Sequence, residues 1–549
     1  MVQDVKINEK RRILYYEKGW WGNETLSDVW SRQVAIFSER PHVRDDKGTH
    51  FTYGQVDEAA DRLAAWFISR GVQAGDVVSF QLPKWAEFAV VYVACLKVGA
   101  IMNPLPLAYT AEDALYALRL AKSSVCVLPS LFHGTDYEAR LPVLTQEVPT
   151  LKGVLVVDSE GAASRSREFP VLSRVLREYG PAKLPNSGNA DDIACIMPTS
   201  GTTGRPKAVM LSHNNILFSE RSYVSVLGLC PKDVAWMPSP LNHATGFFHG
   251  MISSMLSGSS IVLESLYSPR HAVELINREG CTWSHGATPF IYDLLSYLDE
   301  TGESIDSMRF YLCGGAPVPQ SLFRRALDYG LLLCESYGST ESCPHVYVPL
   351  DRCVEWRGRF SGIPYEGIEV RVVDEGRIDV GAGMQGEEAS RGPNVFLGYL
   401  GDPEATNAVL DDDGWFYSGD LCVRDREGRI RINGRKKEII IRGGENISAR
   451  EIEETLADHP DIADLAAIGM PDERMGERLC VFVAPKDGKV PPSLEGLLAY
   501  LEESGVPKRL WPEHLETVEA LPYTATGKVS RPRLRQLLAK RLDSNMHED

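Results

Sequence analysis

Residues 198–208 place hydroxyl side chains and two glycines directly ahead of one lysine. Glycine lets backbone N–H groups face phosphate oxygens, hydroxyls add donors, and the lysine adds positive charge. This composition is typical of a loop that wraps a nucleotide triphosphate and points to ATP. It is not a Walker A loop, because Pro206 and Ala208 stand where that pattern has Gly and Ser or Thr. The loop residues are Thr199, Ser200, Gly201, Thr202, Thr203, Gly204 and Lys207.

Four further segments follow this loop in a fixed order: 337–341, 414–420, 434–446 and 522–528. With them the chain resembles the adenylate-forming enzymes, which include acyl-CoA synthetases, luciferases and peptide-synthetase adenylation domains. The similarity runs through nearly the whole chain. It is greatest to medium-chain fatty-acyl-CoA ligases and alicyclic-acid CoA ligases, notably in "PLNHATGFFHG", "GATPFIYDLL" and "GEEASRGPNVFLGY".

The resemblance implies roles in acyl-adenylate formation for residues on several of these segments. Lys528 would bridge the acyl carboxylate and the AMP phosphate, and Thr340 would donate to the α-phosphate. Glu341 would hold Mg²⁺, which suits the negative charge that gathers in the transition state. Asp420 and Arg435 would bind the ribose. The adenine would lie among Gly314, Gly315, Ala316, Pro317, Tyr337 and Gly338.

An apolar acyl pocket is expected after the histidine of Pro240–Gly246. His243 matches the family's gate between the acyl pocket and the thiol channel; a core histidine beside Pro240 is the structural alternative. The expected pocket residues are His243, Phe247, Phe248, Met251, Gly286, Ala287, Phe290 and Gly338.

A second half-reaction with coenzyme A is implied by the C-terminal segment. Lys437 matches the family's hinge, so we expect residues 1–436 to form an AMP- and acyl-binding domain and residues 437–549 a mobile lid. Gly443 and Gly444 leave room for a pantetheine arm, although a simple turn fits them too. The acceptor thiol must come from another molecule, because only about twenty residues follow Lys528.

The resulting hypothesis is an AMP-forming acyl-CoA ligase that uses ATP, Mg²⁺ and coenzyme A on a medium-chain or compact cyclic apolar acid. Ala208 replaces the family's usual glycine, and Pro198 lacks a backbone donor. These two departures leave open a ligase that only thioesterifies an adenylate made by a partner enzyme. Two further alternatives are an adenylating enzyme that loads a carrier protein and a protein that senses acyl-AMP or ATP. Zinc chemistry and a serine hydrolase are poorly supported.

The candidate site residues must be held in place by regular elements, and the sequence predicts layered helices and strands. Residues 51–75 predict a turn and an amphipathic helix, 77–82 a strand, and 88–107 a buried helix and turn instead of a membrane span. Short apolar runs at 125–128, 154–157, 261–263 and 310–312 predict buried strands, and 439–441 and 449–456 predict a strand and a helix of a small α+β lid. We therefore predict an α/β fold with a large multi-subdomain N-terminal domain and this C-terminal lid.

Composition agrees with a large enzyme of more than one domain, since the chain has 549 residues. A net charge of −17 argues against nucleic acid or an anionic membrane as the main partner. The eleven cysteines form no C-x-x-C pair and no signal peptide is evident, so a cytoplasmic location is expected. We also expect a monomer or homodimer.

Overall fold

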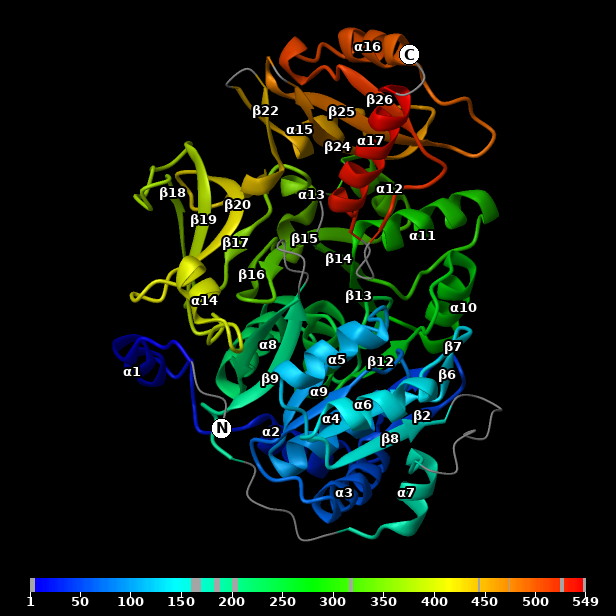
Figure 1. The fold of residues 1–549 in the computed structure, drawn as a ribbon, viewed down its shortest axis with the longest axis vertical. Helices are drawn as coiled ribbons and strands as arrows, with labels where there is room; N and C mark the ends of the chain where they lie inside the picture. The colour runs from blue at the N-terminus through cyan, green and yellow to red at the C-terminus, as the bar shows by residue number, and fades with distance from the viewer. Residues whose placement is uncertain are drawn as a thin grey trace.

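The computed structural model describes residues 5–158, 169–181, 188–199, 206–314, 318, 320–442, 445–472, 474–523 and 528–546. Two mostly parallel sheets, a third antiparallel sheet and a small C-terminal module follow one another along the chain (Figure 1). This arrangement confirms the predicted α/β class with a large N-terminal and a small C-terminal part. Among these residues, no helix is both long and apolar enough to span a membrane.

The largest sheet has nine strands within the described residues, and β15, β14, β13, β11, β12 and β1 run parallel. The carboxyl ends of these strands therefore meet at one edge, where α/β proteins place their ligands. In spatial order the strands are β17 (Ile363–Pro364), β16 (Cys343–Tyr347), β15 (Leu332–Ser339), β14 (Phe310–Gly314), β13 (Trp283–Gly286), β11 (Val234–Met237), β12 (Ser260–Leu263), β1 (Pro41–Asp45) and β2 (His50–Thr52).

Alternate residues of these strands pack into different cores. Ala235 and Met237 belong to a core with helices α4, α8 and η2, whereas Trp236 packs with α10 and α11. Because strand side chains point alternately to the two faces, the sheet is covered on both sides. The helices around it are α4 (Glu87–Val98), α8 (His213–Leu227), the π-helix η2 (Thr245–Ile252), α9 (Ser253–Ser257), α10 (Pro269–Glu279), α11 (Thr288–Thr301), α12 (Gln320–Asp328) and α13 (Cys353–Trp356).

The second sheet has six strands in the part of the chain that the structure describes. Helix α4 ends at Gly99, whose positive φ of 68° reverses the chain. Residues 101–104 then form a strand. The sequence analysis predicted only a turn here, since Asn103 and Pro104 interrupt the short apolar run. The strand order is β10 (Lys207–Ser212), β9 (Ile193–Thr199), β4 (Ile101–Pro104), β3 (Val77–Phe80), β5 (Val125–Pro129) and β8 (Gly153–Val157).

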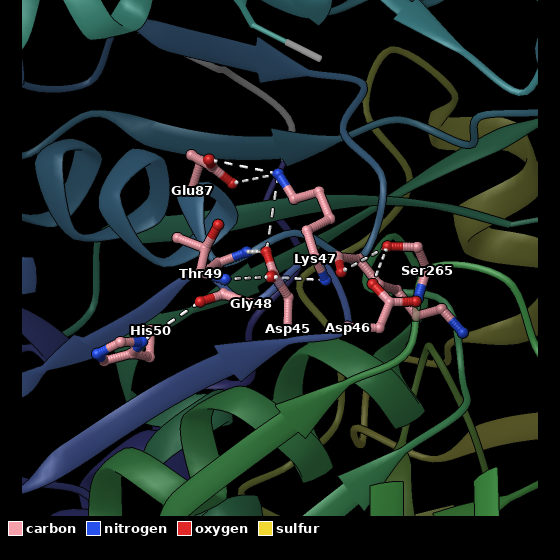
Figure 2. Close-up of polar contacts among 10 residues, drawn as sticks. Asp45, Asp46, Lys47, Gly48, Thr49, His50, Glu87 and Ser265 are labelled. Atoms are coloured by element: carbon pink, nitrogen blue, oxygen red, sulfur yellow. Dashed lines mark hydrogen bonds and ion pairs between the residues drawn. The ribbon is translucent and has the colours of Figure 1, made fainter. Parts of the chain in front are cut away.

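The turn between β1 and β2 ties the two sheets together (Figure 2). The carboxylate of Asp46 accepts bonds from the backbone and hydroxyl of Ser265, just after β12. Lys47 lies 3.3 Å from Glu87 of α4 and stacks on Trp85, while Asp45 accepts the Ala86 N–H. The turn therefore bonds both to the largest sheet and to the helix that covers the second one.

Helices on the outer faces complete these layers. The predicted amphipathic helix is α3 (Tyr53–Ser69), which begins with a capping box on Thr52. The others are α1 (Glu9–Glu17), α2 (Leu26–Phe37), α5 (Ala111–Leu120), α6 (Leu141–Glu147), α7 (Leu172–Glu178) and α14 (Pro403–Val409).

The antiparallel third sheet and the C-terminal module lie beside and above the large layers in Figure 1. The sheet is formed by β18 (Glu369–Val373), β19 (Gln385–Arg391), β20 (Phe416–Arg424) and β21 (Ile430–Arg435). The module contains the predicted strand and helix as β22 and α15. Its elements are β22 (Ile439–Arg442), β23 (Glu445–Ser448), α15 (Ala449–Leu456), β24 (Ile462–Asp472), β25 (Gly476–Pro485), α16 (Leu494–Glu503), β26 (His514–Thr517) and α17 (Arg531–Met546).

Candidate functional site

Asp420 and Arg435, predicted to bind ribose, are paired across adjacent strands β20 and β21. Arg435 Nε lies 3.0 Å from Asp420 Oδ1, and Tyr337 donates its hydroxyl to Oδ2 at 2.8 Å. Burial raises the pKa of Asp420, an effect that the Arg435 charge opposes. Both oxygens of this carboxylate are therefore held in place before any ligand arrives.

A buried His–Glu pair, which the sequence analysis did not predict, lies next to Tyr337. His345 Nε2 is 3.1 Å from Glu388 Oε1, and the Tyr337 hydroxyl is 3.3 Å from Glu388 Oε2. His345 Nδ1 lies 3.1 Å from the Cys343 carbonyl. The pair thus connects the Tyr337–Asp420 bond to the backbone of β16. Glu388 lies within segment 386–399, one of the segments on which the family resemblance rests, but the resemblance assigned no role to this residue.

Tyr399, which the sequence analysis also missed, joins the predicted metal ligand to the phosphate-loop lysine. Its hydroxyl donates to Glu341 Oε1 at 2.8 Å, and Lys207 Nζ lies 4.4 Å from its ring centroid. Thr340, next to Glu341, is buried. The structure therefore brings Lys207, at the start of β10, close to Thr340 and Glu341 in the turn that follows β15.

The described residues contain no group of three potential His, Cys, Asp or Glu metal ligands. Proteins commonly hold Mg²⁺ through one or two carboxylates together with substrate phosphates. Glu341 fits such a role, because the hydrogen bond from Tyr399 to Oε1 holds its carboxylate in one orientation.

Lys528 lies at this same site although it comes from the C-terminal module. Burial and the nearby Arg435 guanidinium lower the pKa of its ammonium, while Asp420, Glu438 and Glu341 act in the opposite direction. The predicted adenylation lysine thus shares an electrostatic environment with the predicted ribose and metal ligands. Arg531, three residues later, lies 2.6 Å from Glu453 and 3.3 Å from Glu438, which anchors the segment that carries Lys528.

His243 is influenced electrostatically by Lys528 of the C-terminal module and by His249 of η2. Burial, with the added effect of these two groups, lowers the pKa of its imidazole to about 3. The ring is therefore neutral at physiological pH, with Nδ1 3.1 Å from the Thr245 hydroxyl.

The residues expected to line the acyl pocket gather near η2 and the end of β13. Phe247, Phe248 and Met251 are fully buried, and Phe247 packs edge-on against Phe88 and Tyr92 of α4, which are core contacts. A Cβ on Gly286 would lie 2.2 Å from the Tyr311 hydroxyl, so no other residue fits there; Ala287 follows it, and Phe290 lies close by. Gly338 likewise lies against the Cys343 backbone.

The two departures from the family pattern face each other at the base of the phosphate loop. Ala208 pairs with Pro198 in the β9–β10 ladder, next to the Lys207–Thr199 pair. Neither residue lies in the loop itself. Loop residues Ser200, Gly201, Thr202, Thr203 and Gly204 lie outside the described residues, as do Gly315, Ala316, Pro317, Gly443 and Gly444, whereas Gly314 ends β14.

Contacts across the predicted boundary at Lys437 hold the C-terminal module against the third sheet. Arg431 of β21 lies 2.6 Å from Glu454 of α15, and Ser448 donates to the Asn433 carbonyl at 2.7 Å. Lys437 itself lies in a short 3₁₀ turn, Lys436–Glu438. The hinge at this turn and the boundary 436/437 remain predictions.

Comparisons with known proteins agree on one family. The model of the AMP-binding enzyme matches residues 30–400, and that of the AMP-binding enzyme C-terminal domain matches residues 451–528. A medium-chain fatty-acid–CoA ligase of Escherichia coli is 41% identical, over 99% of this chain and 96% of its own length. A Mycobacterium tuberculosis CoA ligase for a methyl-dioxo-octahydroindenyl propanoate is 31% identical, over 89% and 94%. Crystalline ATP-bound MatB of Rhodopseudomonas palustris superimposes with a TM-score of 0.84 at 27% identity, over 94% and 99% of the two chains.

Proposed function

This chain belongs to the AMP-binding enzyme family, and from that premise we propose how it acts as an AMP-forming acid–CoA ligase and which acid it takes. The acid carboxylate attacks the α-phosphorus of ATP and releases pyrophosphate. The thiol of coenzyme A then attacks the acyl-adenylate carbonyl and releases AMP. The single observation that carries this proposal is that Lys528, which belongs to the C-terminal module, is buried within electrostatic range of Asp420, Arg435 and Glu341.

Each site residue has a defined task in this proposal. Asp420 accepts hydrogen bonds from the ribose hydroxyls, and Arg435 and Tyr337 hold its carboxylate for that purpose. Lys207 and Lys528 supply positive charge where the carboxylate meets the phosphate. Glu341 would hold Mg²⁺ against the phosphates, and the ion would supply further charge neutralisation.

The acid is a medium-chain or compact cyclic carboxylic acid. The buried side chains Phe248 and Met251 beside neutral His243 support an apolar acyl site, and the relatives named above act on acids of these kinds. Because Ala208 and Pro198 sit in a strand pair and not in the phosphate loop, they give no reason to assign the first half-reaction to a partner enzyme.

A substrate panel tests this function. The protein is incubated with ATP, Mg²⁺ and single acids, with either coenzyme A or a pantetheinylated carrier protein as acceptor. We expect acyl-CoA, AMP and pyrophosphate from octanoate or cyclohexanecarboxylate. Formation of ADP and phosphate, turnover of amino acids alone, or loading of the carrier alone would contradict the proposal.

A further inference from the structure

Beyond His243 lies a buried polar cluster to which the reaction above assigns no task. It comprises Glu220 and Tyr223 of α8, His249 of η2, Ser253 of α9 and His285 of β13. Glu220, Tyr223 and Ser253 are fully buried, and His249 and His285 are 2% and 3% exposed. These elements pack in the core between the two large sheets.

The cluster has two hydrogen-bonded halves that stack on each other. His249 Nδ1 lies 3.0 Å from Glu220, and Ser253 donates to the same carboxylate at 2.7 Å. Tyr223 bonds to His285 Nδ1 at 2.9 Å. The rings of His249 and His285 are nearly parallel with centroids 5.3 Å apart, and Tyr223 stacks on both. These contacts fix the orientation of both imidazoles.

Each imidazole uses only Nδ1, and neither Nε2 has a hydrogen-bond partner among the described residues. Neither Nε2 is among the fully enclosed side-chain atoms of the described residues that lack a partner. Both therefore border space that water or a ligand group can occupy, and such a group would complete the hydrogen bonds of the cluster.

His285 Nε2 lies next to the predicted adenine-binding segment. A Cβ built on Gly314, at the end of β14, would be 3.3 Å from it. His243 is influenced electrostatically both by Lys528 and by His249. An acid whose carboxylate lies at Lys528 and whose chain passes His243 thus extends toward this cluster.

The hydrogen bonds at Nδ1 leave one nitrogen of each ring for another group. Tyr223 and His285 Nδ1 share one hydrogen bond, and Glu220 and His249 Nδ1 share another. Burial keeps the pKa of His285 well below its usual value, so this ring is neutral. Nε2 of each ring is therefore the nitrogen that can bond to a ligand group.

We propose that His249 and His285 form a specificity wall in the acyl site that selects carboxylic acids carrying a hydroxyl group. A hydroxyl both donates and accepts, so it can satisfy His249 Nε2 and His285 Nε2 together, whereas a methylene satisfies neither. This inference rests on the acid–CoA ligase function and narrows its substrate class.

Matched acid pairs test the wall on the wild-type enzyme. Octanoate and cyclohexanecarboxylate are each compared with their positional hydroxy isomers by kcat/KM for acyl-CoA formation. We expect at least one hydroxy isomer to exceed its parent by about tenfold, the value of one good hydrogen bond. Parents used as well as or better than every hydroxy isomer would overturn the wall while leaving the ligase function intact. Turnover of no acid at all would instead defeat the ligase function on which the wall rests.

Variants test whether His249 and His285 cause any preference for the hydroxy acid. His285→Phe and His249→Leu should each reduce the hydroxy preference to near parity, with a smaller effect on the parent acid. His249→Gln, whose amide can still form a hydrogen bond, should retain part of it. The matched control is His50→Leu, an exposed histidine in β2, which should change neither value. A hydroxy preference that persists in both wall variants would overturn the assignment; thermal melting identifies variants that do not fold, and the wild-type ranking stands without them.

Discussion

At the scale of single residues, the site is a set of side chains whose partners come from far along the chain. The motifs predicted Asp420, Tyr337 and Arg435, and the structure places all three in mutual contact. They did not predict the His345–Glu388 pair behind them or the link from Lys207 through Tyr399 to Glu341. Residues 192 positions apart, such as Lys207 and Tyr399, leave no pattern of spacing that a single sequence can reveal.

Replacing Lys528 should separate the two half-reactions. Lys528→Ala removes the charge that would stabilise the developing negative charge of adenylation, so acid-dependent exchange between pyrophosphate and ATP should lose roughly 3 kcal/mol of transition-state stabilisation. Attack of coenzyme A on pre-formed acyl-adenylate should be spared. Both steps are measured with the same acid. Equal losses in both would show that Lys528 supports the structure and not the first step.

Tyr399→Phe tests the link to Glu341. It deletes only the hydroxyl that donates to Oε1 and keeps the ring beneath Lys207. Loss of one hydrogen bond to a charged group costs about 1.5–3 kcal/mol, so the Mg²⁺ and ATP concentrations needed for half-maximal exchange should rise at least tenfold. Tyr116→Phe, on the helix α5, serves as control. An unchanged Mg²⁺ dependence would remove Tyr399 from the site.

At the scale of elements, the sequence predicted helices and strands wherever their periodicity was clear. Tyr53–Ser69, Val125–Pro129 and Ala449–Leu456 are examples. It missed the π-helical form of η2, which depends on tight packing: a Cβ on Gly246 would lie 2.2 Å from the Pro240 carbonyl. That widened turn orients His249, so the specificity wall could not be predicted from residue types alone.

The β1 strand should make the protein sensitive to mild acid. His42 is fully buried between Tyr53 and Tyr92, and burial lowers its pKa to about 3. The pKa of His42 in the folded protein lies below its unfolded value of 6.5. The stability that depends on neutral His42 is therefore fully present above pH 6.5 and is lost as the pH falls toward 3. Between pH 6.5 and 5 the free energy of unfolding should fall by about 2 kcal/mol because of this group. Urea unfolding of His42→Phe should show a correspondingly flatter pH dependence; an unchanged slope would contradict this assignment.

The Arg431–Glu454 contact should favour the arrangement that places Lys528 in the site. Glu454→Gln weakens an ion pair that crosses the predicted boundary, and partly exposed pairs contribute up to about 1 kcal/mol. Pyrophosphate exchange should therefore fall by up to about fivefold, without a matching fall in thioesterification. The control is Glu451→Gln on the same helix, because Glu451 pairs with Arg509 inside the module. Equal effects of the two variants would argue against a role for the contact.

At the scale of the whole molecule, two large sheets and an antiparallel sheet carry the nucleotide and acyl residues, and a small module delivers one lysine to them (Figure 1). The family follows from the ordered motifs, and the fold class follows from the clear periodicity of the elements between them. The acid's identity does not follow, since it depends on how α8, η2 and β13 pack around His249 and His285.

Transfer of isotope from the acid tests the central claim most directly. The enzyme is given octanoate or cyclohexanecarboxylate labelled with ¹⁸O in both carboxylate oxygens, with ATP, Mg²⁺ and coenzyme A. If the carboxylate attacks the α-phosphorus and the adenylate is then cleaved by the thiol, one ¹⁸O must appear in AMP and one must remain in the acyl-CoA carbonyl. Mass spectrometry should therefore find singly labelled AMP in equal amount to acyl-CoA. Unlabelled AMP, or label in inorganic phosphate with formation of ADP, would contradict the account.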